Sequence, residues 1–255
     1  MKIKGAIALV TGANRGLGLH FVEALVEFGA AKIYATARNI DTLGPLVRKH
    51  EGLVVPLGLD VTEKDQVDAV AEAAQDVTLL LNNAGVLDRN GRSLLEVENL
   101  SGFEHETAVN VFGLARMCQA FAPIIEANGG GAIANMLSVA CLVHWPPNGT
   151  YAATKAAAMS LTEVLQFELR DRGVEVFGIY AGWIDTEMAS YAAVDKSSPD
   201  EIASKTMLGI EAGDSDIDAT ESAIQTQIKL QNDPEGRKAN TWLAAAEFRA
   251  KHPLT

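Results

Sequence analysis

The chain has 255 residues, of which 48% are hydrophobic and 21% are charged, and its formal net charge is −12. This length suits one large α/β core, and the apolar content excludes a disordered chain. The negative charge argues against a general affinity for nucleic acid or for an anionic membrane surface.

Neither the cysteines nor the N-terminal residues indicate a secreted or membrane-bound protein. Cys118 and Cys141 are too few for a disulfide framework or a metal-ligand cluster, so we expect two buried thiols that pack as small hydrophobic groups. No apolar run approaches the length of about 20 residues that spans a bilayer. Lys2 and Lys4 precede only a brief apolar run, so we expect no signal peptide. We expect a soluble, cytoplasmic protein.

Short apolar runs alternate with segments of helical period along the chain. Strands are predicted at 6–12, 32–38, 53–60, 77–85, 131–138 and 174–182. Helices are predicted near 16–29, 63–75, 103–127 and 150–172. Strands that are covered on both faces are almost continuously apolar, and the alternation with helices predicts a parallel sheet with right-handed crossovers. We expect one three-layer, doubly wound Rossmann domain over residues 1–255, with the strand order 3-2-1-4-5-6.

Two motifs mark the C-terminal third. The segment "SPDE" (198–201) is a capping box, which predicts a helix that starts at Pro199 with Glu201 reaching back to the cap. The segment "DSDIDATE" (214–221) partly matches a calcium loop, but it lacks the glycine after the third Asp and has Gln225 in place of the last carboxylate. We therefore predict no metal site there. The segment predicts a short seventh strand, or a cap for a helix near 220–231.

A glycine cluster, "TGANRGLG" (11–18), separates the first strand from the first helix. Gly12 can make the tight turn, Gly16 can let the backbone approach a pyrophosphate, and Gly18 can let the helix pack closely on the sheet. The helix N-terminus offers free N–H groups and a positive dipole end to phosphates. A glycine cluster alone is often only a loop, but this position favours a dinucleotide site.

The end of the second strand bears on which dinucleotide binds. An NAD site typically has an acidic residue there for the ribose 2′-hydroxyl, whereas arginine accommodates a 2′-phosphate. Here Ala37 is followed by Arg38, and Arg15 of the glycine cluster could reach the same phosphate. Both arginines could instead be solvated surface residues. The sequence favours NADP(H) over NAD(H).

The segment "YAATK" (151–155) lies in a predicted helix and spaces a phenol and an ammonium by four residues. Tyr151 and Lys155 therefore lie on the same helix face. A nearby cation favours the charged form of a phenol, whose usual pKa is about 10, so we expect a lowered tyrosine pKa. Such a pair also arises by chance, and alone it proves nothing.

Together, TGxxxGxG, "NNAG" (82–85) and "YAATK" resemble the motifs of the classical short-chain dehydrogenase/reductase family, in order and spacing, over residues 5–190. The resemblance implies a catalytic tetrad. Tyr151 would donate a proton to a carbonyl oxygen, and Ser138 would polarise that carbonyl. Lys155 would lower the tyrosine pKa and bind the nicotinamide ribose, and Asn110 would hold a water that connects Lys155 to solvent.

The resemblance also implies the other cofactor contacts. Asp60 would contact the adenine ring, Asn83 to Gly85 would line the adenosine ribose, and Ile184 and Thr186 would bind the carboxamide. The remaining expected cofactor residues are Asn14, Leu17, Val61, Ala84 and Gly182.

The chain departs from the family pattern in two places. Ala181 replaces the usual proline after the sixth strand, which we expect to loosen the loop over the nicotinamide. An acidic stretch, 211–221, stands where an apolar last strand and a glycine-rich ending are common, which bears on the oligomer interface.

The substrate pocket is expected between three segments: the loop after Ser138, the loop after Gly182, and a substrate loop over about 183–213. Its side chains are Val143, His144, Trp145, Trp183, Met188, Tyr191 and Met207. Because this set is mostly apolar and aromatic, it favours a hydrophobic ketone or aldehyde. His144 is expected to be a hydrogen-bonding loop residue and not a catalytic base.

Three functions fit these observations. We favour an NADPH-dependent carbonyl reductase over an alcohol or hydroxysteroid dehydrogenase that oxidises with NAD(P)+. The third is a non-catalytic dinucleotide-sensing protein, but such a protein would be expected to lack Tyr151 or Lys155. Because the helices near 103–127 and 150–172 carry apolar residues on more than one face, we also expect a homotetramer or homodimer.

Overall fold

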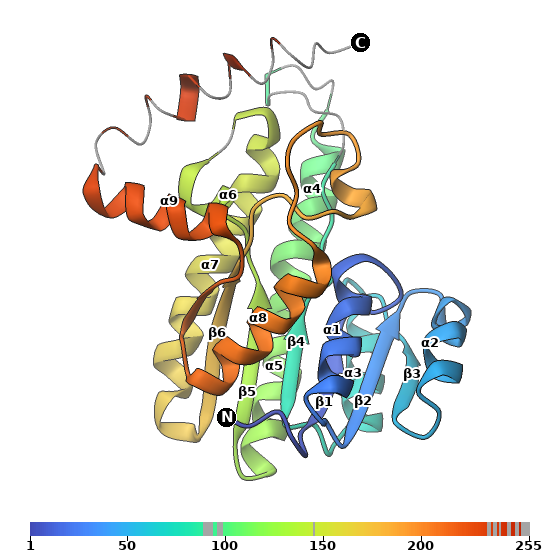
Figure 1. Cartoon of the computed structure of the whole chain (residues 1–255). Coiled ribbons are helices and arrows are strands. Elements are labelled where there is room, and N and C mark those ends of the chain that lie inside the picture. Colours follow the sequence, from blue (N-terminus) through green and yellow to red (C-terminus); the bar gives the residue numbers. More distant parts are fainter. Residues whose placement is uncertain are drawn as a thin grey trace.

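Seven parallel strands form the central sheet, in the order β3-β2-β1-β4-β5-β6-β7 (Figure 1). The computed structural model describes residues 1–88, 94–95, 99–144 and 146–233, together with positions 236, 239, 241–243, 246–247 and 250. The strands are β1 (Ile7–Val10), β2 (Lys32–Ala37), β3 (Val54–Gly58), β4 (Leu79–Asn82), β5 (Gly131–Met136), β6 (Val174–Tyr180) and β7 (Asp216–Asp218). The predicted doubly wound sheet and its strand order are confirmed, and each predicted strand is present in a shorter form.

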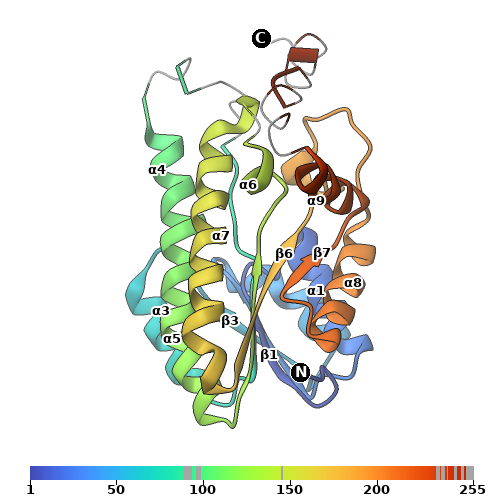
Figure 2. The same cartoon turned by 90° about the vertical axis from the view of Figure 1, so that its left-hand side faces the viewer.

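Helices cover both faces of the sheet, which Figure 2 shows edge-on. On one side lie α1 (Gly16–Glu27), α2 (Gly44–Lys49) and α8 (Pro199–Ala212). On the other side lie α3 (Lys64–Ala73), α5 (Leu114–Ala127) and α7 (Gly149–Leu169). The shorter α4 (Ser101–Thr107) and α6 (Ala140–Val143) and the C-terminal α9 (Glu221–Asn232) lie toward the end of the molecule where the strands finish (Figures 1 and 2).

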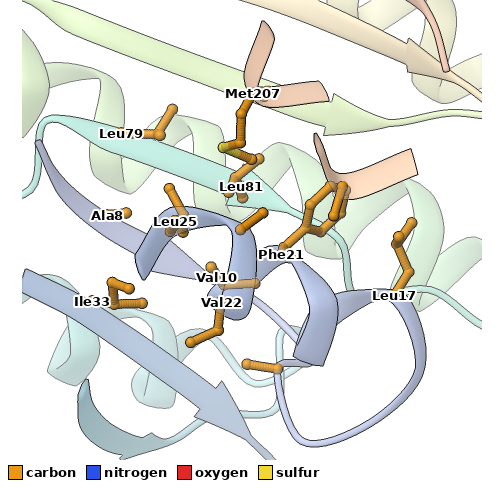
Figure 3. Close-up of a cluster of buried hydrophobic side chains, with 14 of the residues drawn as sticks. Ala8, Val10, Leu17, Phe21, Val22, Leu25, Ile33, Leu79, Leu81 and Met207 are labelled. Atoms are coloured by element: carbon orange, nitrogen blue, oxygen red, sulfur yellow. The ribbon is translucent and has the colours of Figure 1, made fainter. Parts of the chain in front are cut away.

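The alternation of side chains along β1 produces two hydrophobic cores. Ala8 and Val10 point into the core under α1 and α8, and Leu9 points into the core under α5 and α7. Figure 3 shows the first core, in which Phe21 and Leu25 of α1 meet Leu81 of the sheet. Because both faces of the strands are buried, their sequences are apolar throughout.

The predicted helix at 103–127 is interrupted by a π-helical turn, Ala108–Gly113, between α4 and α5. The continuous stretch Ser101–Ala127 is long and apolar enough to cross a membrane by length and composition, but 56% of its most apolar part is buried inside the protein. A helix of the sheet-covering layer accounts for that composition. The π turn lies next to the cavity described below, as such turns often do.

The capping box before α8 is only partly formed. Ser198 is the N-cap residue and Pro199 begins the helix, as predicted, but within the part of the chain that the structure describes no side-chain hydrogen bond caps the helix. Glu201 pairs with Lys205, one turn later, at 2.7 Å, and so does not reach back to the cap. A charged partner at i+4 competes with the backbone N–H for this carboxylate.

Both structures predicted for residues 214–221 are present, one after the other: the segment first forms β7 and then caps α9. The Thr220 hydroxyl accepts a hydrogen bond from Ala223 N in the first turn of α9, at 3.2 Å, and another from Gly182 N, at 3.1 Å. A Cβ atom at Gly182 would lie 2.1 Å from the Ser222 hydroxyl oxygen. The start of α9 therefore packs directly on the backbone that follows β6.

Candidate active site

A cavity of about 1090 Å³ opens at the C-terminal ends of the strands. This is the end of a doubly wound sheet where ligands bind, because the strand order reverses between β1 and β4. Every residue expected to contact the cofactor lines it: Gly12, Asn14, Arg15, Gly16, Leu17, Gly18, Ala37, Arg38, Asp60, Val61, Asn83, Ala84, Gly85, Tyr151, Lys155, Gly182, Ile184 and Thr186.

The glycine loop has the geometry of a phosphate cradle. Gly12 and Gly16 have φ angles of 67° and 53°, which favour glycine. A Cβ atom at Gly18 would lie 2.1 Å from Gly12 O, so only glycine lets α1 pack this closely on the loop. Among the described residues no side-chain hydrogen bond caps α1, and its first residues line the cavity at the positive end of the helix dipole. The residues present therefore fit a dinucleotide pyrophosphate.

The segment after β4 is fastened to the end of β1. The Thr11 hydroxyl accepts hydrogen bonds from Asn83 N and Ala84 N, both at 2.9 Å. The Asn83 amide donates to Thr11 O at 2.9 Å. These bonds hold residues 83–85 against the glycine loop and so fix one wall of the cavity.

Two arginines line the cavity. Arg38 directly follows β2 and is exposed, and neither Ala37 before it nor Asn39 after it is acidic. Arg15 is paired with Glu187 of the segment after β6. Sequence reasoning did not identify Glu187, although its position next to Thr186 was a signal.

Ser138, Tyr151 and Lys155 line the cavity together. Ser138 follows β5, and its hydroxyl accepts a hydrogen bond from Ala140 N at 3.1 Å. Tyr151 and Lys155 lie on one face of α7, with the ammonium 5.7 Å from the centre of the phenol ring. The Lys155 ammonium donates to Met136 O at 2.7 Å.

Burial shifts the protonation of both α7 groups. It lowers the pKa of Lys155 to about 8, because a charged ammonium is poorly solvated there. It also raises the pKa of Tyr151, although a hydrogen bond with Ser138 acts in the opposite direction. The expected lowered pKa of Tyr151 is therefore wrong, because desolvation by burial outweighs the hydrogen bond with Ser138.

Asn110 lies behind the cavity wall and does not line it. It is buried in the π turn, where its amide accepts a hydrogen bond from Val86 N and donates to Val86 O, both at 2.9 Å. The amide also donates to the Thr154 hydroxyl at 3.0 Å, on the turn of α7 between Tyr151 and Lys155. Asn110 thus joins the segment after β4 to α7.

Some of the predicted substrate residues lie at the cavity. Val143, Trp183 and Met188 line the cavity. Tyr191 packs edge-on against Trp183, with ring centres 5.9 Å apart, and its hydroxyl accepts a hydrogen bond from Asn148 at 3.0 Å. Trp145 lies outside the described residues.

Two of the predicted substrate residues are elsewhere. Met207 is fully buried and points into the core between α8 and the sheet (Figure 3), because it lies on the inner face of α8. That prediction is wrong. His144 is exposed at the end of α6 with a φ angle of 50°, and it is not among the lining residues, so its side chain is not part of the pocket.

The substrate side of the cavity is more polar than predicted. The additional lining residues include Asp88, Ser101, His105 and Asn148. Three of them belong to the segment after β4 and to α4, which sequence reasoning did not consider for the pocket. No motif marks them, so only the three-dimensional arrangement could identify them.

The segment expected to cover the substrate, 183–213, consists of two parts. Residues 183–184 and 186–189 line the cavity, and a bridge between Ile184 and Ser197 holds this part. Residues 199–212 form α8. The Ala181 carbonyl, where the family usually has proline, accepts a hydrogen bond from Val139 N at 3.0 Å, so this turn is tied to the segment after β5.

Comparison with known proteins gives consistent matches. A family model described as short chain dehydrogenase matches residues 6–197. A short chain dehydrogenase from Burkholderia cenocepacia J2315, solved in complex with NADP, is 36% identical and superposes with a TM-score of 0.89, covering 94% of this chain and 99% of that one.

Two further relatives are described with a different cofactor or with a named substrate. A short chain dehydrogenase/reductase from Burkholderia phymatum, solved in complex with NAD, is 26% identical with a TM-score of 0.82, covering 92% of this chain and 96% of that one. The gluconate 5-dehydrogenase of Gluconobacter oxydans is 31% identical over 214 residues, which are 81% of this chain and 82% of that protein.

Proposed function

The chain belongs to the short-chain dehydrogenase family, and we propose that within it the protein is an NADPH-dependent reductase of the carbonyl group of a hydrophobic ketone or aldehyde. The family makes it an oxidoreductase that acts on alcohol and carbonyl groups. One observation carries the proposal: Ser138, Tyr151 and Lys155 converge in the same cavity as an intact phosphate cradle.

Tyr151 is the proton donor in this proposal. Reduction of a carbonyl needs a proton at oxygen, and the bound nicotinamide would supply the hydride at carbon. The high pKa of the buried phenol keeps it protonated, as a donor requires. The Ser138 hydroxyl would hold the carbonyl oxygen beside the phenol.

Lys155 would replace the proton that Tyr151 loses. Its ammonium lies against the phenol ring, and with a pKa of about 8 it can give up a proton near neutral pH. Asn110 holds α7 and the segment after β4 at a fixed distance, through Thr154 and Val86. That contact would keep Lys155 and Tyr151 in register with the cofactor site.

Arg38 supports the choice of NADPH. An exposed guanidinium directly after β2, with no acidic residue next to it in the sequence, is suited to a 2′-phosphate and not to a ribose hydroxyl. The complex of the 36% identical Burkholderia cenocepacia protein with NADP points the same way.

The lining of the substrate side supports a hydrophobic carbonyl compound. Val143, Trp183 and Met188 provide apolar and aromatic surface on the side of the segment that would cover the substrate. A second candidate is an alcohol dehydrogenase that works in the oxidative direction. The polar residues Asp88, His105 and Asn148 favour it, since a hydroxylated substrate would use them.

We also propose that the protein is a homodimer or homotetramer built on α5 and α7. Phe112, Val164 and Phe167 are exposed hydrophobic residues on the π turn and α7, and Phe167 is 71% exposed. A second subunit would cover these rings.

Initial rates of the purified protein on a panel of ketones and aldehydes, with NADPH and with NADH, test the proposal. We expect NADPH to bind at least tenfold more tightly, an effect of about 1.4 kcal/mol. The variant Arg38→Asp should reverse that preference. Equal affinities in the wild-type protein, or oxidation of alcohols without measurable reduction of any ketone at neutral pH, would contradict it.

A further inference from the structure

A buried carboxyl group stands one helical turn before Asn110. Glu106 of α4 is 0% exposed. Its Oε1 atom accepts a hydrogen bond from Asp88 N at 2.7 Å. Burying a carboxyl group lowers the stability of the fold unless other groups form hydrogen bonds with it, so a buried carboxyl group suggests a specific role.

Glu106 and Asn110 act on the same two elements. Asn110 binds the backbone of Val86 and the hydroxyl of Thr154. Glu106 binds the backbone of Asp88, two residues further along the same segment. It also contacts the side chain of Thr150, four residues before Thr154 on α7. The two side chains are therefore successive links between the segment after β4 and the catalytic helix.

The Glu106 link lies closest to the proposed chemistry. Asp88 lines the substrate side of the cavity, and Thr150 directly precedes Tyr151 at the start of α7. Glu106 is also among the charges that act on the Tyr151 phenol. The other carboxyl oxygen, Oε2, is buried and has no hydrogen-bond partner among the described residues.

We propose that Glu106 is a positioning residue of the reaction: it fixes the first turn of α7 against the Asp88 wall, and so sets where Tyr151 meets the substrate carbonyl. This inference rests on the proposed reductase function. The role of Glu106 is to accept the Asp88 N–H bond and to fill the site, and not to carry a negative charge. A positioning error of about 1 Å can cost about a hundredfold in rate.

Burial supports a neutral carboxyl, because it raises the pKa of Glu106, against the hydrogen bond from Asp88 N. The groups that face it include Asp88, His105 and Tyr151. The Tyr151 phenol in turn faces Cys141 of α6 and Tyr191 of the segment after β6, with Lys155 beside its ring. If Glu106 ionised, its charge would raise the pKa of Tyr151 and oppose release of the phenol proton.

Two variants of Glu106 distinguish its role as a hydrogen-bond acceptor from a role of its negative charge. Glu106→Gln keeps an oxygen acceptor and cannot ionise, whereas Glu106→Ala removes the acceptor. We expect Glu106→Ala to lower kcat by about ten- to a hundredfold, with the Kd of NADPH changed less than twofold. Glu106→Gln should keep kcat within about threefold and leave the acidic side of the pH profile unchanged. Glu104→Ala, on the exposed face of α4, is the matched control and should behave as wild type.

Amide hydrogen exchange adds a measurement that does not depend on turnover. The Asp88 amide should be protected in the wild-type protein and in Glu106→Gln, and should exchange at least tenfold faster in Glu106→Ala, while the far-UV circular dichroism stays unchanged.

The outcomes are distinct. A folded Glu106→Ala protein with wild-type kcat overturns the proposal, and so does a Glu106→Gln protein as impaired as Glu106→Ala, since the charge would then be needed. Tyr151→Phe is measured in parallel. If Tyr151→Phe is fully active, the proposed function fails instead; if it is inactive while Glu106→Ala is normal, only the positioning role fails.

Discussion

Arg15 of the glycine loop is ion-paired with Glu187 of the segment that follows β6, and both residues line the cavity. The pair joins the two parts of the chain that would enclose the cofactor. Gly16 and Thr186, their sequence neighbours, are also in contact range, since a Cβ atom at Gly16 would lie 3.5 Å from the Thr186 methyl carbon. Arg15 is therefore already occupied by an anion before any phosphate arrives.

Glu187→Gln should increase the affinity for NADPH. If Arg15 contacts the 2′-phosphate, Glu187 competes for it, and exposed ion pairs of this kind are worth about 0.2–1 kcal/mol, or up to about fivefold in Kd. Titration calorimetry should show tighter binding of NADPH and no change in the affinity for NADH, which lacks the 2′-phosphate. Arg15→Ala is the control background, in which Glu187→Gln should have no effect. A change of the same size for both cofactors would show that Glu187 acts on something other than the phosphate.

Tyr151→Phe should abolish most of the activity. The substitution keeps the ring and its packing but removes the acid beside the substrate carbonyl. Positioned general acids contribute about 10²–10⁴-fold, so kcat should fall by at least about a hundredfold. The Kd of NADPH, measured by fluorescence, should stay within about twofold because the backbone of the cofactor site is untouched. Reduction of a good ketone at an undiminished rate would refute the assignment.

Lys155→Met should raise the thermal stability at pH 7 while it removes the activity. Burial lowers the pKa of Lys155 from 10.5 to about 8. Between these values the unfolded chain holds more protons than the folded one, so the contribution of Lys155 to stability increases as the pH rises through that window. Below pH 8 the folded protein bears the full cost of a buried ammonium, on the order of 1–3 kcal/mol.

The measurement is a series of melting curves for both proteins from pH 6.5 to 10. The difference in Tm between Lys155→Met and wild type should be largest at the acidic end and shrink toward pH 10. A difference that is constant over the series would mean that lost packing, and not protonation, separates the two proteins.

Gly18→Ala should disrupt the phosphate site. Its Cβ atom would lie 2.1 Å from Gly12 O and 2.6 Å from the Asn83 amide nitrogen, so α1 would have to move away from the loop. Such overpacking costs about 1–3 kcal/mol of stability. We expect a lower midpoint in urea and a markedly higher Kd for NADPH. Gly58→Ala, where a Cβ atom meets nothing within 4 Å, is the matched control and should leave both values unchanged.

Phe167→Glu should dissociate the proposed oligomer. The ring is 71% exposed on α7, and a carboxylate there would be desolvated in an interface between two copies. Light scattering at micromolar concentration should report a homodimer or homotetramer for the wild type and a smaller species for the variant. Leu208→Glu, at an exposed position of α8 on the other side of the sheet, should keep the wild-type mass. A wild-type monomer would exclude the interface.

The sheet and the cofactor side of the cavity could be predicted from the sequence because their signals are local. Apolar runs mark the buried strands, and the glycines mark backbone positions that no other residue can adopt, as the close approach of Gly18 to Gly12 shows. Spacing was also sufficient for Tyr151 and Lys155, since a helix fixes their relation.

The substrate side could not be predicted in the same way, because its residues come from segments whose contacts are not local. Met207 has a suitable composition for a pocket, but the rotation of α8 about its axis points it into the core. Glu106 looks like one more surface acid of a helix, and only the approach of Asp88 and Thr150 shows that it is buried.

The hydroxyl of Thr220 has consequences for exchanging parts between relatives. It caps α9 and also holds the backbone N–H of Gly182, while Ser222 packs on the same glycine. A chimera that takes its C-terminal region from another member of the family therefore has a natural junction after Ser222, which keeps residues 220–222 with the loop that they support. A junction placed between Gly182 and Thr220 would instead combine a Gly182 loop from one relative with a start of α9 from another. The loss of stability would then appear in the loop after β6, far from the exchanged helix in sequence.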